Sequence, residues 1–270
     1  MPYPDHAMAN PINRWWQRRR LEQARADIDP ALWPTVQARL PLLDGLDAAQ
    51  SERLRDLAAL FLRRKAFETA RGAVLDEPTR MELALQACLP VLELGLDWYR
   101  GWHALILYPD EFVPAREVMD EAGLVWIDDE PKSGEAWEQG PVILSLTDAL
   151  AGRRRDGYNV VIHELAHKLD LLDGAANGRP PLHADMDGSA WAAAFARAYA
   201  GLCRQADATA DLCVIDPYGA TSPAEFFAVV SESFFELPHR LRGAYPPVYA
   251  QLAAFYRQDP ALRLRPVSGR

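Results

Sequence analysis

The stretch NVVIHELAHKLD, from Asn159 to Asp170, constrains the fold of this chain more than any other part of the sequence. It places His163 and His167 four residues apart, with Glu164 directly after the first histidine. On an α-helix, residues i and i+4 project from the same face, so the two imidazoles can bind one metal ion. The apolar residues before and within the motif would pack such a helix into a core. The stretch therefore predicts a buried helix with a metal-binding face.

The HExxH pattern is typical of zinc hydrolases, in which the glutamate is the general base for a water molecule. The alternative is a helix whose histidines only cap or hydrogen-bond. A hydrolytic site also needs a third protein ligand. The class with Gly and His at the third and sixth positions after the motif is excluded, because Asp170 and Asp173 stand there. Asp173 and His183 remain candidate ligands, and Lys168 departs from the broad pattern, which favours an uncharged residue.

Glu225 is the strongest candidate for the third ligand. Ser222 and Pro223 are typical of the first positions of a helix, which puts Glu225 in its first turn. Its side chain then either folds back onto the Ser222 N–H in a capping box or binds metal from a helix that crosses the HExxH helix. The local sequence favours neither role over the other.

The remaining pattern predicts an α+β fold, with helices around a small mixed sheet. Strands of one sheet are indicated where branched and aromatic residues cluster, at residues 103–109, 123–130 and 141–146. Helices are indicated by apolar periodicity or turn signals at residues 47–67, 78–102 with a break at Pro90, 189–205, 222–237 and 246–258. We divide the chain into a poorly ordered N-terminal arm, either a tail or a helix (1–30), a helical region (31–98) and a catalytic domain (99–270).

The composition excludes several classes of protein. A formal net charge of −9 argues against direct binding to nucleic acid, which requires a basic surface. No apolar run is long enough for a membrane helix, and the N-terminus has no apolar signal core. The 3 cysteines form no CxxC pair, which favours buried thiols in a reducing compartment. These features predict a cytoplasmic protein.

Four segments together resemble the Mlc titration factor A family. They are CLPVLELGLDWYRGWHALILYP, GYNVVIHELAHKLD, DPYGATSPAEFFAVVSESFF and FYRQDP. Members of this family are bacterial gluzincin peptidases, similar in fold to the catalytic domain of anthrax lethal factor. The resemblance runs from about residue 35 to 262 and leaves out both ends of the chain. It implies a zincin-like catalytic domain with an N-terminal helical region.

The resemblance also implies roles for single residues. His163, His167 and Glu225 match the ligands of one Zn²⁺ ion, and Glu164 matches the general base. Tyr218 matches a tyrosine that stabilises the oxyanion, whereas its local sequence favours a tyrosine packed in a turn. The implied function is a cytosolic, aminopeptidase-like zinc metallopeptidase that acts on a peptide or protein substrate. The alternative is a regulatory protein that sequesters a transcriptional repressor, Mlc.

Other features of the implied site are less determined. Asp170 and Glu232 each lie seven residues after a candidate ligand, so either can hold the outer N–H of a ligand histidine or form an ordinary salt bridge. We place the strand PVILSL, residues 141–146, at the sheet edge, where an extended peptide can pair with it. The polar segment 128–138 reads as a surface loop or a lid, and residues 1–30 as an arm that is able to cover the site.

Overall fold

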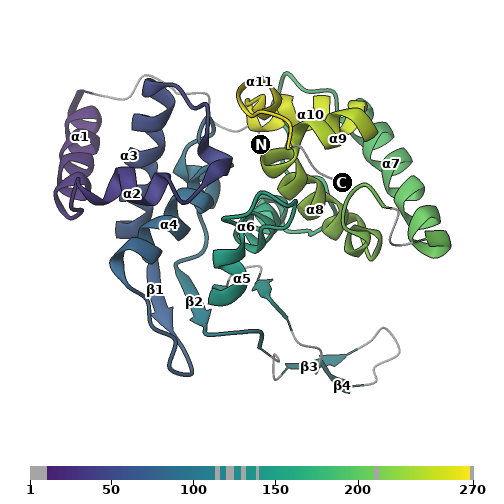
Figure 1. Cartoon of the computed structure of the whole chain (residues 1–270), viewed down its shortest axis with the longest axis horizontal. Helices are drawn as coiled ribbons and strands as arrows, with labels where there is room; N and C mark the ends of the chain where they lie inside the picture. The colour runs from purple at the N-terminus through teal and green to yellow at the C-terminus, as the bar shows by residue number, and fades with distance from the viewer. Residues whose placement is uncertain are drawn as a thin grey trace.

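The computed structural model describes residues 11–112, 116–119, 125–128, 132–137, 140–209 and 213–267. Helices pack together on one side of a small sheet (Figure 1). The α-helices are α1 (Pro11–Ala26), α2 (Leu32–Gln37), α3 (Ala48–Arg64), α4 (Glu77–Cys88), α5 (Leu146–Ala151), α6 (Val160–Asp170), α7 (Gly188–Thr209), α8 (Pro223–Glu236), α9 (Pro238–Ala244), α10 (Pro246–Tyr256) and α11 (Pro260–Arg263). Short 3₁₀ helices are η1 (Pro41–Leu43), η2 (Leu96–Tyr99), η3 (Leu171–Asp173) and η5 (Pro217–Ala220). The strands are β1 (Ala66–Thr69), β2 (Ala104–Tyr108), β3 (Arg116–Met119), β4 (Val125–Asp128), β5 (Gly134–Ala136) and β6 (Val142–Ser145).

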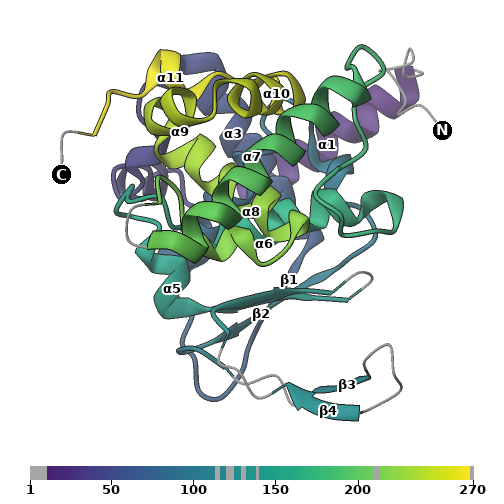
Figure 2. The same cartoon turned by 90° about the vertical axis from the view of Figure 1, so that its right-hand side faces the viewer.

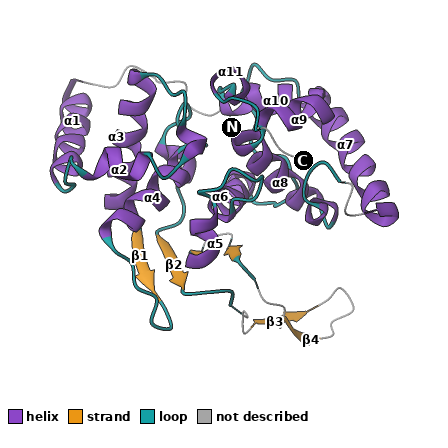
Figure 3. Ribbon diagram, viewed as in Figure 1, coloured by secondary structure: helices purple, strands orange, loops and turns teal. Residues whose placement is uncertain are grey.

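The main sheet has four strands in the order β1-β2-β6-β5. The first three are parallel, and β5 runs antiparallel to β6. This mixed sheet with its flanking helices confirms the α+β prediction. In Figure 2 the helices lie on one side of β1 and β2, and the pair β3–β4 lies on the other side. Figure 3 shows the same separation of helices and strands by colour. The helices therefore cover one face of the sheet, which is the face that carries the core.

Two strand predictions are corrected. The strand at 141–146 is β6, but it lies between β2 and β5 and is not at the edge. The two edges are β1 and β5, and the sequence did not reveal β5 because Gly134, Glu135 and Ala136 have low strand propensity. The predicted strand at 123–130 contains β4, which pairs with β3 in a separate two-stranded sheet instead of joining the main one. Segment 128–138, read as a loop or lid, contributes this edge strand, and residues 129–131 and 138 lie outside the described residues.

Helix limits follow local signals. Asp47 caps α3 in a capping box with Gln50, and α3 ends at Arg64 because β1 follows. Asp76 caps α4, whose second residue is a proline, and α4 ends at Cys88 shortly before Pro90. The predicted helices at 47–67 and 78–102 therefore exist but are shorter than predicted. No helix in the described part of the chain is long and apolar enough to cross a bilayer.

One hydrophobic core crosses the boundary that we place at residue 98. It contains Leu54 and Leu85 from the helical region together with Leu144, Leu165 and Phe227 from the catalytic domain. Strand β1 lies before the boundary and pairs with β2 after it. The division at residue 98 stays a prediction, since one sheet and one core span it.

Part of the N-terminal arm is helical. Pro11–Ala26 form α1, which packs on α3, and the poor order of residues 1–30 stays a prediction. Ala24 is fully buried and the guanidinium of Arg25 contacts the carboxylates of Glu52 and Asp56. These contacts anchor the last turns of α1 on α3. In Figure 1, α1 lies on the outer side of α3, away from α6, so it does not cover the candidate site. Residues 1–10 lie outside the described residues.

Candidate metal centre

Helix α6 carries the HExxH motif. Asn159 is its N-cap, and its side-chain oxygen accepts the N–H of Ile162 at 3.0 Å. Asn is a preferred N-cap residue, so the sequence contained this signal. Asp156, three residues earlier, accepts the N–H of Tyr158 at 3.2 Å. Every residue of α6 is buried except His167, which is partly exposed, so the motif lies in the core.

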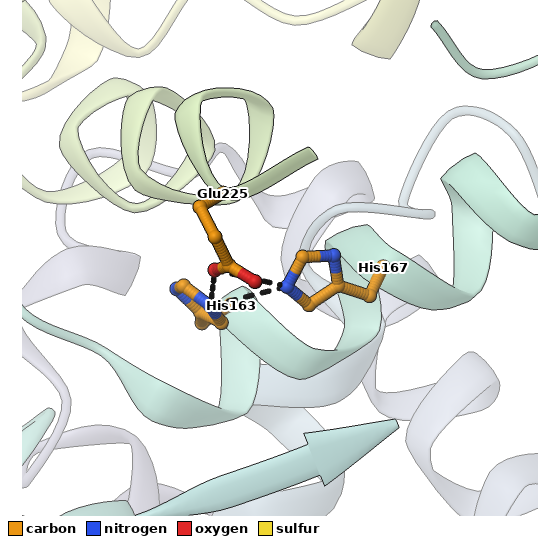
Figure 4. Close-up of side chains that lie close together, drawn as sticks. All are labelled: His163, His167 and Glu225. Atoms are coloured by element: carbon orange, nitrogen blue, oxygen red, sulfur yellow. Dashed lines mark hydrogen bonds and ion pairs between the residues drawn. The ribbon is translucent and has the colours of Figure 1, made fainter. Parts of the chain in front are cut away.

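Helix α8 packs against α6 and brings Glu225 to the motif. Ser222 caps α8, with its Oγ accepting the Glu225 N–H at 3.1 Å. The Glu225 carboxylate points away from the cap and toward His163 and His167, as Figure 4 shows. The two roles that the local sequence left open are thereby separated: Ser222 is the cap, and the Glu225 side chain belongs to the histidine cluster.

The three side chains converge on one point. The distance from His163 Nε2 to Glu225 Oε2 is 2.9 Å, and from His167 Nε2 to the same oxygen 3.3 Å. The two Nε2 atoms are 3.2 Å apart. In a tetrahedral site with ligands about 2.0–2.1 Å from zinc, neighbouring ligand atoms are about 3.3 Å apart. His163, His167 and Glu225 are also the group whose ligand atoms all lie within 4.8 Å of one another in the described part of the chain. The donor set and its spacing therefore fit a tetrahedral metal ion.

Charge is concentrated in this cluster. Burial disfavours the imidazolium form of His163, but hydrogen bonds to Glu225 and Glu232 outweigh it and raise its pKa well above the usual value. Burial likewise opposes the charged form of Glu225, but hydrogen bonds from His163 and His167 lower its pKa. The surroundings of these groups thus stabilise an anionic carboxylate together with positive charge. A divalent cation satisfies the same requirement.

Glu232 contacts the ring nitrogen of His163 that faces away from Glu225. Its Oε1 lies 2.7 Å from His163 Nδ1, and its Oε2 accepts the Asn159 N–H at 2.5 Å. With Nδ1–H donating to Glu232, the Nε2 lone pair of His163 is directed at the point shared with Glu225. Asp170 and Glu232 were the two candidates for holding the outer N–H of a ligand histidine. Glu232 is the one that contacts His163.

Asp170 has a different contact. Its Oδ2 accepts the backbone N–H of Gly178 at 2.7 Å, and burial raises its pKa to about 6. The two alternative ligands also lie elsewhere. Asp173 is exposed at the end of η3. His183 donates its Nε2–H to the Phe255 carbonyl oxygen at 2.8 Å. These three residues are outside the cluster of histidines and Glu225.

Glu164 lies on the side of α6 that faces the edge strand. It is buried, its Oε2 has no hydrogen-bond partner in the described part of the chain, and burial raises its pKa. Its Oε1 lies so close to Gly134 that a Cβ at that glycine would be 2.4 Å away. A buried carboxylate with an unused oxygen and a raised pKa is suited to accept a proton.

Tyr218 lies near the cluster. It belongs to η5, which packs on α8, and its ring centroid is 6.1 Å from that of His163. The side chain is 53% exposed, whereas the residues of α6 around the motif are buried. Its placement beside the histidines on the solvent side is compatible with a contact to a bound molecule.

Sequence reasoning missed a buried polar network that fixes the start of α6. The Asn159 side-chain N–H₂ donates to Gln86 of α4 at 2.9 Å and to Glu236 of α8 at 3.0 Å. The other oxygen of Glu236 accepts the Gly157 N–H at 3.0 Å. These three hydrogen bonds join residues more than 70 positions apart, so no local sequence pattern indicates them. Only the cap from Asn159 to Ile162 is local.

Comparison with known proteins identifies the family of the chain. Residues 13–257 match the family described as glucose-regulated metallo-peptidase M90. The chain is 39% identical over 228 residues to Mlc titration factor A of Yersinia pestis (strain Pestoides F), which covers 84% of each protein. The same values hold for Mlc titration factor A of Yersinia pseudotuberculosis serotype O:3 (strain YPIII). The match spans both α6 and α8, and the chain therefore belongs to the Mlc titration factor A family of M90 metallopeptidases.

Proposed function

We propose that this protein is a zinc-dependent peptidase in which Glu164 is the general base. Family membership implies a metal ion. The observation that carries the proposal is the convergence of His163, His167 and Glu225, with the free oxygen of Glu164 on the next face of the same helix. Two nitrogens and one carboxylate oxygen are the ligand set of gluzincin sites and leave one coordination position open.

Each residue has a task in this proposal. When bound, zinc lowers the pKa of water and polarises a carbonyl group. His163, His167 and Glu225 hold the ion, and Glu232 keeps the His163 ring in the required tautomer. Glu164 accepts a proton from the attacking water and passes it to the nitrogen of the leaving amine. Its burial supports this role, because a raised pKa makes the carboxylate a better base.

Tyr218 is proposed to stabilise the oxyanion. Its hydroxyl would donate a hydrogen bond to the negative oxygen that develops when the peptide carbonyl is attacked. The position of its ring beside His163 supports this role. The replacement Tyr218→Phe is expected to lower kcat about 10²- to 10³-fold, as loss of one oxyanion donor does elsewhere. An unchanged kcat would leave Tyr218 as a packing residue of η5.

An extended peptide is the proposed substrate. Strand β5 has β6 as its only strand partner in the described part of the chain, so its other edge offers backbone groups to a peptide. This edge passes directly beside Glu164. The sequence analysis proposed PVILSL as the strand that pairs with a peptide. We now propose β5 for this role. Aminopeptidase-type cleavage and a cytoplasmic location are further proposals; the free thiols of Cys88, Cys203 and Cys213 suit a reducing compartment.

The test combines metal content and peptide turnover on the wild type and Glu164→Gln. We expect one zinc per chain in both proteins and turnover only in the wild type, measured with an N-terminally free peptide and its acetylated counterpart. Preference for the free peptide supports an aminopeptidase. Zinc in both proteins without turnover in either contradicts the peptidase proposal for these substrates, and no zinc in either contradicts the metal site.

The name of the relatives supports a second function. They are called Mlc titration factor A, and we propose that this chain also binds a repressor of the Mlc type. Binding of this kind does not depend on the general base. In a binding assay with such a repressor, Glu164→Gln is therefore expected to bind as tightly as the wild type. Failure of both proteins to bind contradicts this second function and leaves the peptidase proposal unaffected.

A further inference from the structure

The charged residue that follows the HExxH motif has a specific place in the fold. Lys168 comes directly after His167, and only 3% of it is exposed. Its Nζ donates hydrogen bonds to the backbone carbonyl oxygens of Trp137 and of Gly140, the latter at 3.0 Å. Both carbonyls belong to the turn between β5 and β6. A buried ammonium on the motif helix therefore binds the turn that follows the edge strand.

Helix α6 presents two neighbouring stripes. His163 and His167 form one stripe, which faces Glu225 of α8. Glu164 and Lys168 are also four residues apart and form the second stripe, about 100° around the helix. This second stripe faces the β5–β6 hairpin at both positions: Glu164 lies against Gly134, and Lys168 binds the turn.

Strand β5 is held unevenly along its length. Just before it, Lys132 pairs with Phe112 through two backbone hydrogen bonds of 3.0 and 2.8 Å. Its three residues then pair with β6. After the strand, the backbone hydrogen bonds among the described residues are longer, with Trp137 N–H donating to the Pro141 oxygen at 3.3 Å and Gly140 N–H to the Trp137 oxygen at 3.2 Å. The contacts of Lys168 reinforce this second, less tightly bonded end of the strand.

We infer that Lys168 is a positioning residue, which holds the β5–β6 hairpin on α6 so that the edge strand stays in place beside Glu164. The inference rests on the proposed function, because the edge strand is where the peptide is proposed to bind. Two hydrogen bonds from one ammonium fix both sides of the turn, and the ammonium is buried, which strengthens them. Lys168 touches neither substrate nor metal in this arrangement and acts only through the strand.

The chain contains a matched control for this residue. Lys65 is also buried, and its Nζ donates to two backbone carbonyls, those of Tyr99 and Trp102, each at 2.6 Å. Both lysines lie over the ring of Trp102, with Nζ 3.6 Å from the centroid for Lys65 and 5.5 Å for Lys168. Loss of either ammonium removes the same kind of contact, but only Lys168 bonds to the β5–β6 turn.

The experiment compares Lys168→Met with Lys65→Met in the zinc-loaded full chain. Amide hydrogen exchange of residues 132–137 is expected to rise about tenfold or more in Lys168→Met, the effect of losing a hydrogen bond to a charged group, and to stay at the wild-type rate in Lys65→Met. For a peptide substrate, kcat/KM is expected to fall about 10- to 100-fold in Lys168→Met, with a higher KM and unchanged zinc content. Lys65→Met is expected to keep the wild-type KM.

Exchange in this segment needs no substrate, so it tests the inference even if the wild type shows no turnover. Wild-type exchange at residues 132–137 in Lys168→Met would overturn the inference. Equal exchange in both variants would also overturn it, because Lys168 would then be an ordinary buried lysine. If Lys168→Met does not fold, Lys168→Gln is compared with Lys65→Gln by the same two measurements.

Discussion

Helix α6 is held differently on its two sides. On the α8 side the polar contacts join charged or polar side chains: Glu225 with the histidines, Glu232 with His163, and Glu236 with Asn159. On the β5 side Glu164 lies against the Gly134 backbone, and Lys168 binds the turn. The proposed metal side thus pairs carboxylates with histidines, whereas the proposed substrate side keeps a carboxylate oxygen of Glu164 without a hydrogen-bond partner in the described part of the chain.

This difference separates two requirements. A metal site needs ligands fixed before the ion arrives, and the carboxylates of α8 supply that rigidity. A peptide site needs backbone groups that are free until the substrate binds. We therefore expect substitutions on the α8 side to change metal affinity and those on the β5 side to change turnover with the metal retained. The following predictions test this separation.

The largest effect is expected for Glu225→Ala. Removal of a ligand should lower zinc affinity by more than the roughly 10- to 100-fold that loss of an outer partner causes. Competition with a chromophoric chelator measures the affinity. The control is Glu77→Ala, since Glu77 is also an acidic residue in the first turn of a helix but is exposed in α4. If Glu225→Ala bound zinc about as tightly as the wild type, Glu225 would not be a zinc ligand.

Glu232→Gln tests the outer partner. Glu232 accepts from both His163 Nδ1–H and the Asn159 N–H, whereas a glutamine has only one acceptor oxygen and cannot serve both, so zinc affinity should fall about 10- to 100-fold. The same chelator competition applies, with Asp170→Asn as the control, since Asp170 bonds to Gly178 and not to the cluster. A loss of turnover at full zinc occupancy without any loss of affinity would contradict the separation of the two sides.

Gly134→Ala tests the β5 side. A Cβ there would lie 2.4 Å from Glu164 Oε1 and 2.6 Å from its Cγ, so either the carboxylate or the strand must move. We expect kcat to fall about 100-fold with unchanged zinc content, because small displacements of a reacting group have effects of that size. Gly201→Ala is the control, since a Cβ at Gly201 meets nothing within 4 Å. Full activity of Gly134→Ala would show that Glu164 tolerates the displacement.

The smallest effect concerns pH and stability. Burial raises the pKa of Glu236 to about 8 from 4.5, against the opposing hydrogen bonds from Asn159 and Gly157. Between these values the folded protein keeps a proton that the unfolded chain has lost, so stability falls as pH rises, by about 1.4 kcal/mol per pH unit for one proton. Glu236→Gln should flatten this slope between about pH 4.5 and 8, measured by urea unfolding. Parallel pH profiles for both proteins would contradict the raised pKa.

The sequence predicted the parts of the site that are encoded locally. The i, i+4 spacing of His163 and His167 on a buried helix is a local property, and it holds in the structure. The helix start at Ser222 is also local, but the direction of the Glu225 side chain is not. It depends on α8 packing against α6, which joins residues 62 positions apart. Only the family resemblance favoured the metal role for Glu225.

The sequence could not predict β5 or the role of Lys168. Three residues of low strand propensity become a strand because β6 pairs with them and α6 packs over them. Lys168 departs from the usual motif pattern, but its partners are backbone carbonyls, which leave no mark in the sequence. Tertiary contacts of this kind decide the edge of the sheet, and for this reason the edge was assigned to the wrong strand.

The separation of the candidate ligands along the chain has a consequence for folding. Because Glu225 lies 62 positions after His163, an ion held by both acts as a reversible cross-link that closes a loop containing all of α7. By the chain-entropy relation used for disulfides, closure of such a loop corresponds to about 4 kcal/mol. A ribosome-bound chain that ends before α8 lacks the second anchor. A metal cross-link between these two residues would therefore form only after α6, α7 and the start of α8 have been synthesised.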